Sequence, residues 1–145
     1  MLYGKQTTRS NIRNKQKENI LMSIKPEFAY KIFKGIKKFE YRKKVFNKTG
    51  VKVYVYASSP KKKIIGEFIV GNIICDTPEQ LWERTKDGSG ISEEFYFKYF
   101  KGKTKAYAIE VKNYILYDEP INPKDVIDNF VAPQSYMFIN TLKLN

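Results

Sequence analysis

The sequence contains no histidine and only one cysteine, Cys75. No disulfide can form within the chain, and a zinc site, which is built mainly from Cys and His, is not expected. The same absences remove Ser-His-Asp and Cys-His catalysis. Any acid–base chemistry must therefore use Lys, Asp, Glu, Tyr or backbone groups. We expect no metal and no other cofactor.

Long apolar runs are also missing. No stretch is long enough to span a bilayer, so no membrane partner is expected. Residues 1–19 lack the apolar core of a secretory signal, and we expect a cytoplasmic protein. The 145 residues fit one domain, and a hydrophobic content of 42% is enough to bury a core.

Acidic residues are scarce in the first part of the chain. Residues 1–63 hold 18 of the 27 Lys and Arg but only three of the 15 Asp and Glu, a net charge of +15, whereas residues 64–145 carry −3. A basic half with interleaved Tyr and Phe indicates a polyanionic partner, nucleic acid before membrane. We interpret residues 1–19, which are polar and basic, as an arm, and residues 20–145 as a single domain.

Strands dominate the predicted elements. Runs of β-branched and aromatic residues predict strands, one of them bent at its internal glycines, over 20–24, 38–42, 51–57, 64–74 and 105–117. In the last of these, alternation places Ile109 inward and Ala108 outward. The tail, 126–144, is apolar enough to pack back on the domain.

Capping signals predict three helices between these strands. They begin near Pro26, Pro78 and Glu93, and Gly35 is the expected end of the first. We expect a flexible loop over 87–90 and a turn over 119–123. The order of elements predicts an α+β fold, a small mixed or antiparallel β-barrel flanked by helices.

The motif Gly35-x-Lys37-x-x-Glu40-x-Arg42 follows the first predicted helix. In an extended segment, alternation places Lys38, Glu40 and Arg42 on one face and the two aromatic residues between them on the other. Such a strand can form the floor of a polar pocket. It can equally be a surface strand with a solvated Glu–Arg pair.

This motif, with Ser23-Ile24-Lys25-Pro26 before it, resembles the signature of the ASCH domain, a family with a PUA-like β-barrel. Gly66-Glu67-Phe68 and Ala106-Tyr107-Ala108-Ile109 resemble its core strands, and the likeness covers about residues 20–140. Val131-Ala132-Pro133-Gln134-Ser135 resembles the tail of longer members described as transcriptional regulators. The resemblance implies a cleft, lined by the motif, for RNA or a modified nucleoside.

PUA-like domains mostly bind RNA, and a few ASCH proteins are enzymes, either ribonucleases or N4-acetylcytidine amidohydrolases. The resemblance makes Lys37 the counterpart of the amidohydrolase lysine, and Asp87 the counterpart of its acidic residue. Glu40 stands where that group has a threonine, which argues against acyl transfer. In an enzyme, Lys37 and Glu40 would be the catalytic pair, with Asp87 as a third candidate.

A binding module would use the same residues differently. Lys37 and Arg42 would contact phosphate, and Glu40 would accept a hydrogen bond from a base edge. The residues expected to bind nucleic acid are Lys25, Lys37, Glu40, Arg42, Lys43, Ser58, Ser59, Lys61 and Lys62.

Five further residues receive expectations from their positions in the sequence. Tyr54 and Tyr56 share a strand face and can stack on bases, although at least one is expected in the core. Trp82 is expected in the core, and Gln134 and Ser135 are candidates to close the cleft from the tail.

We predict a nucleic-acid-binding module, with RNA the favoured partner. The alternative is a small hydrolase that acts on RNA or a modified nucleoside. A protein-interaction or regulatory module is a second alternative, and its complex would survive nuclease treatment.

Overall fold

The computed structural model describes residues 19–144, so the predicted arm lies, apart from Asn19, outside the described residues. Within these residues, six strands form one mixed sheet in the order β2-β5-β4-β3-β1-β6. The strands are β1 (Asn19–Ile24), β2 (Phe39–Arg42), β3 (Lys52–Ala57), β4 (Lys63–Asp76), β5 (Ala106–Ile121) and β6 (Tyr136–Ile139). The helices are α2 (Pro26–Phe33), α3 (Pro78–Thr85) and α4 (Glu93–Tyr99), with short 3₁₀ helices η1 (Lys86–Gly88) and η2 (Pro123–Asp125).

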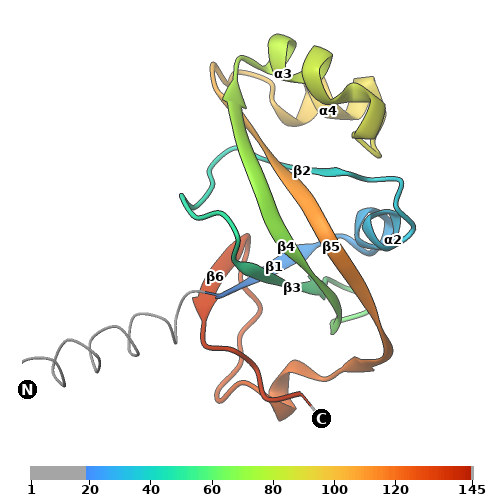
Figure 1. The fold of residues 1–145 in the computed structure, drawn as a ribbon, viewed down its shortest axis with the longest axis vertical. Helices are drawn as coiled ribbons and strands as arrows, with labels where there is room; N and C mark the ends of the chain where they lie inside the picture. The colour runs from blue at the N-terminus through green and yellow to red at the C-terminus, as the bar shows by residue number, and fades with distance from the viewer. Residues whose placement is uncertain (1–18, 145) are drawn as a thin grey trace, which may run out of the picture.

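Strands β4 and β5 run along the length of the molecule, with α3 and α4 at one end and β1, β3 and β6 towards the other (Figure 1). β1 pairs with β3 in parallel, and the remaining pairs are antiparallel. The sheet curls into a half-barrel, whose two ends are β2 and β6. This confirms the predicted α+β fold, as a half-barrel with three α-helices among the described residues.

The bend predicted for the fourth strand is present in β4. Its pairing with β5 shifts register at three places along the strand. At Gly66 a side chain would collide with the carbonyl oxygen of Ile115 and the ring of Phe33, so the two strands and α2 approach closely there. These register shifts bend the long hairpin of β4 and β5, so that its two halves contribute to the two ends of the molecule.

Both faces of β5 are covered where the strand begins. Ile109 belongs to the main core, which α2 covers, whereas Ala108 packs with Trp82 and Tyr96 beneath α3 and α4. The expectation that Ala108 faces outward is wrong, because these helices build a second core on that side. Trp82 is a core residue, as predicted. The turn expected over 119–123 is also wrong in its first half, since β5 continues to Ile121.

The helix signals are confirmed at the residues that carry them. The hydroxyl of Thr77 accepts a hydrogen bond from the backbone of Gln80, and the hydroxyl of Ser92 does the same for Phe95. Gly35, with φ of +75°, ends α2 and turns the chain towards β2.

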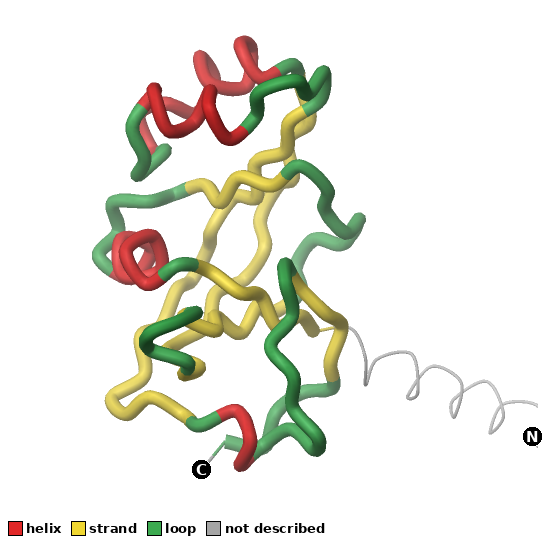
Figure 2. Tube along the Cα trace, turned by 180° about the vertical axis from the view of Figure 1, so that it is seen from behind, coloured by secondary structure: helices red, strands yellow, loops and turns green. Residues whose placement is uncertain are grey.

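The tail packs back on the domain, as predicted. After β5 the chain runs as a long loop along the lower end of the molecule and returns as β6, which pairs with β1 (Figure 2). It covers a third apolar cluster that includes Tyr54 and Tyr56. Tyr54 is fully buried and cannot stack on a base, because it lies beneath this tail.

Candidate functional site

A cleft of about 920 Å³ opens between α2, β2, α4 and the segment that leads into β6. Of the residues that the structure describes, its walls carry one carboxylate, Glu40, and seven basic side chains: Lys25, Lys37, Arg42, Lys43, Lys44, Lys62 and Lys103. Six aromatic side chains complete the walls: Phe28, Tyr41, Tyr56, Phe95, Tyr99 and Tyr136. Ligand pockets measure roughly 300–1,000 Å³, so this cleft can hold a small ligand or a short segment of a polymer.

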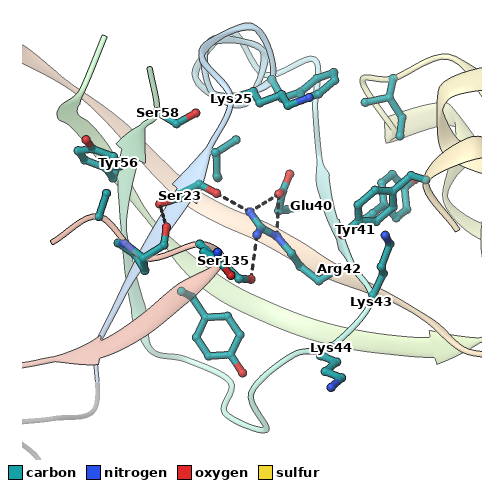
Figure 3. A pocket seen from close by; sticks show the side chains of 18 of the residues that line it. Ser23, Lys25, Glu40, Tyr41, Arg42, Lys43, Lys44, Tyr56, Ser58 and Ser135 are labelled. Atoms are coloured by element: carbon teal, nitrogen blue, oxygen red, sulfur yellow. Dashed lines mark hydrogen bonds and ion pairs between the residues drawn. The ribbon is translucent and has the colours of Figure 1, made fainter. Parts of the chain in front are cut away.

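Strand β2 directs Glu40 and Arg42 into the cleft, as the alternation predicted (Figure 3). Lys37, not Lys38, completes the group. The chain becomes a strand only at Phe39. Before it, the backbone of Lys38 is held by Gly88 and Val111 while its side chain stays exposed. The prediction that Lys38 shares a face with Glu40 is therefore wrong.

The guanidinium of Arg42 is held by three protein partners (Figure 3). Its Nε and Nη2 lie 3.0 Å and 2.7 Å from Oε2 of Glu40. Its Nη2 also donates to the carbonyl oxygen of Ser23 at 2.8 Å, and its Nη1 donates to Oγ of Ser135 at 3.1 Å. Because most of its N–H donors already bind protein groups, Arg42 serves as a strut, a side chain that holds Glu40 in position.

Lys37 lies behind Glu40, and its side chain is 2% exposed. Its Nζ donates to the carbonyl oxygen of Ser89 at 2.8 Å and lies 3.8 Å from Oε1 of Glu40. The same nitrogen lies 4.9 Å from the ring centroid of Tyr41. Burial above all, with a smaller contribution from the nearby charge of Arg42, lowers the pKa of Lys37 from 10.5 to about 8, although Glu40 opposes the shift. Lys37 therefore changes its charge close to neutral pH.

Glu40 is the hydrogen-bond acceptor of this group that a ligand can reach. Its side chain is 9% exposed. With Arg42 on one oxygen and Lys37 near the other, the carboxylate is fixed at the floor of the cleft. A fixed carboxylate beside an amine of altered pKa is a common arrangement in sites of proton transfer.

The structure brings most of the other predicted site residues to this cleft. They are Lys25, Lys43, Ser58, Ser59 and Lys62, and Gln134 and Ser135 close it from the tail, as predicted. Tyr56 also reaches it, although the residue is only 5% exposed.

Two predicted residues do not belong to the cleft. Lys61 is exposed in the turn beside it, and Asp87 is exposed on η1, so neither side chain is on the walls. The expected flexible loop at 87–90 is wrong as well. Gly88 and Ser89 are buried, and Ser89 and Gly90 accept hydrogen bonds from Lys37 and Lys31.

Sequence reasoning missed the residues that α4 and this buried loop supply. Phe95 and Tyr99 come from α4, and Nζ of Lys43 lies 4.6 Å from the ring centroid of Tyr99. The signal was weak, because aromatic residues on a short helix are usually core. The two glycines around Ser89 indicated close approach as much as flexibility.

Within residues 19–144, no three Asp, Glu, His or Cys side chains group closely enough to hold a metal ion. None of the helices in that part of the chain is long and apolar enough to cross a membrane.

Comparison with known proteins places the chain in a family. The ASCH domain model matches residues 22–115. An ASCH domain-containing ribonuclease of Zymomonas mobilis is 29% identical over 130 residues, 85% of each chain. A crystal structure of ASCH from Zymomonas mobilis superposes with a TM-score of 0.80 at 29% identity, over 86% of this chain and 89% of that one. The large ribosomal subunit protein uL22 of Ureaplasma parvum is 32% identical over 82% of this chain, which spans 38% of that protein. The chain belongs to the ASCH domain family.

Proposed function

We propose that this protein is a ribonuclease whose active site is the cleft around Glu40. One observation carries the proposal. A carboxylate and a buried lysine with a pKa of about 8 form the floor of a cleft whose other charged wall residues, among those described, are all basic. The relative from Zymomonas mobilis, which is named a ribonuclease and aligns over 85% of this chain, supports it.

The walls of the cleft suit single-stranded RNA. Lys25, Lys43 and Lys62 can neutralise phosphates at the rim. Phe95 and Tyr99 offer ring faces on which bases can stack, and stacking on aromatic side chains tolerates any base. We therefore expect affinity to fall steeply with salt, with a slope of about −0.7 per phosphate contacted.

The proposed cleavage needs no outside nucleophile, because RNA carries its own. Glu40 accepts the proton of a 2′-hydroxyl, and the freed oxygen attacks the neighbouring phosphorus. The bond from phosphorus to the 5′-oxygen breaks, and that oxygen takes a proton from a rim lysine such as Lys43. The products are a 2′,3′-cyclic phosphate and a 5′-hydroxyl, and no water is consumed.

Lys37 is a positioning residue in this scheme, since it acts through Glu40. While its amine is charged, it stabilises the carboxylate and weakens Glu40 as a base. Above the Lys37 pKa of about 8 the amine is neutral, so Glu40 accepts protons more readily. The rate of cleavage should therefore rise as pH passes through about 8.

Cleavage of an end-labelled single-stranded RNA, followed on a gel across a range of pH, tests the proposal. Glu40→Gln should slow cleavage at least about 100-fold, the lower end of what a general base contributes. Lys37→Met should lose the rise with pH, whereas Lys38→Met, an exposed lysine one position along, should keep it. RNA with 2′-O-methyl groups should bind but stay intact. An intact natural RNA with wild-type protein, or full activity in Glu40→Gln, would overturn the assignment.

A second candidate, an RNA-binding module without turnover, is the main expectation from the sequence. It is favoured by the bonds of Lys37 and Arg42, which already engage the protein. Tight, salt-dependent binding with no product from RNA would support it. Nucleoside analysis of total RNA in the same assay tests the amidohydrolase alternative through loss of N4-acetylcytidine. The regulatory role and the cytoplasmic location stay predictions.

A further inference from the structure

An exposed aromatic residue continues the cleft along the edge strand β6. Tyr136 lines the cleft, and Phe138 follows it two positions along the strand, so both side chains lie on one face. Their ring centroids are 6.0 Å apart. Phe138 is 44% exposed, beyond the end of the cleft.

The loop after β2 packs against the rings of Tyr136 and Phe138. The ring of Phe46, a residue that is 5% exposed, lies 5.1 Å from Tyr136 and 6.4 Å from Phe138, measured between centroids. Both contacts are edge-to-face, the arrangement that aromatic pairs prefer. Phe138 is therefore held in place by packing, while the rest of its surface remains open.

The same loop supplies positive charge beside the exposed ring. Nζ of Lys48 lies 5.3 Å from the ring centroid of Phe138, and Lys44 lines the neighbouring part of the cleft. On its other side Phe138 borders a separate cavity whose charged wall residues are Asp125, Asp128 and Lys143. Because acidic residues outnumber basic ones on that wall, an anion leaving the cleft past Tyr136 is drawn to the Lys48 side.

We propose that Phe138 and Lys48 form a further RNA subsite, in which a base stacks on the ring and the amine contacts its phosphate. This inference rests on the proposed function, because the nucleotide belongs to the same strand that enters the cleft. Proteins that bind single-stranded nucleic acids combine aromatic side chains, on which bases stack, with basic side chains that contact the phosphates. The subsite gives the protein a preference for RNA longer than the cleft itself can hold.

Binding of uncleavable 2′-O-methyl oligonucleotides, measured by fluorescence anisotropy, tests the subsite. We compare chains of four and ten nucleotides. Phe138→Ala should weaken binding of the longer chain about tenfold, within the range for loss of one stacked base, and leave the shorter chain unchanged. Phe138→Trp should restore it. Lys48→Met should lower the salt slope for the longer chain by about 0.7.

Leu116→Ala is the matched control, because Leu116 is as exposed as Phe138 but lies on the hairpin of β4 and β5 outside the cleft walls. Equal loss of both oligonucleotides in Phe138→Ala would overturn the subsite, as would unchanged binding of the longer one. In both cases the wild-type cleft still binds RNA. If the wild type binds neither oligonucleotide, the proposed function itself fails.

Discussion

Arg42 and Ser135 lie 93 positions apart in the sequence, yet Nη1 of the arginine donates to Oγ of the serine at 3.1 Å. Arg42 ends β2, one end of the sheet, and Ser135 precedes β6, the other end. The same guanidinium reaches the carbonyl oxygen of Ser23 at the end of β1. One side chain therefore links the two ends of the half-barrel across the cleft and fixes Glu40 at its floor.

Arg42→Met should lower the free energy of unfolding by about 3 kcal/mol, because it removes one partner of a buried ion pair and leaves the other without its main contact. Urea unfolding measures the loss. Arg84→Met is the control, since the Arg84 side chain is 54% exposed in its pair with Asp76, and such pairs contribute about 1 kcal/mol or less. Similar small losses in both variants would contradict the role of Arg42 as a strut.

The stability of the protein should depend on pH through Lys37. Its pKa in the folded chain is about 8, below its ordinary value of 10.5. Between these values the unfolded chain binds more protons, so the free energy of unfolding rises with pH. From pH 8 to 9.5 the wild type should gain about 1.5 kcal/mol over Lys37→Met, which has no amine to titrate.

Urea unfolding of both proteins at pH 7, 8 and 9.5 measures this difference, and groups common to both cancel. The series stops at 9.5 because Tyr41, whose pKa burial raises to about 12, acts in the opposite sense above pH 10. Its ring contacts Lys37, so its contribution need not cancel between the two proteins. Between pH 7 and 8 the difference should change little. A constant difference up to pH 9.5 would show that Lys37 titrates as a solvated lysine does.

Glu40→Gln should lower the pKa of Lys37 further. The negative charge of Glu40, whose Oε1 lies 3.8 Å from Nζ of Lys37, raises this pKa in opposition to burial. Its removal therefore makes the protonated amine less stable. Nitrogen-15 NMR of the lysine side chains follows the amine directly. Glu79→Gln, on an exposed position of α3, should leave the titration unchanged. An upward shift in Glu40→Gln would contradict the electrostatic coupling.

Local signals in the sequence were sufficient for most of the fold. Thr77 and Ser92 cap their helices, Gly35 ends α2, and the internal glycines of β4 coincide with its bend. These features depend on neighbours a few residues away. The outward assignment of Ala108 failed because α3 and α4, which precede β5 along the chain, fold back over the face of the strand that carries Ala108. Periodicity cannot indicate a second core on the far face of a strand.

In the candidate site, too, the residues set by local pattern were predicted and those set by distant contacts were not. Alternation placed Glu40 and Arg42 together because they share one short strand. It selected Lys38 in place of Lys37, because the start of the strand is set by hydrogen bonds to Gly88 and Val111, which the sequence does not reveal. The partners of Lys37 and Arg42, Ser89 and Ser135, are similarly distant.

Gly90 should be the residue of the buried loop that tolerates substitution least. Its φ is +67°, and a Cβ there would lie 2.5 Å from Cβ of Lys37 and 2.9 Å from its Cα. Gly50 has a similar φ of +73°, but a Cβ there meets nothing within 4 Å. Gly50→Ala therefore measures the backbone strain alone, about 1–2 kcal/mol, and Gly90→Ala measures the same strain with the collision added.

Collisions of this kind in a packed interior cost about 1–3 kcal/mol, so Gly90→Ala should lower the free energy of unfolding by that much more than Gly50→Ala. Thermal and urea unfolding compare the two. The displaced Lys37 should also move away from Glu40, so its pKa should change in Gly90→Ala and stay near 8 in Gly50→Ala. Equal stabilities and an unaltered Lys37 pKa in both variants would mean that the loop around Gly90 shifts to accommodate the new methyl group. The close packing of Gly90 against Lys37 would then not be what fixes the amine behind Glu40.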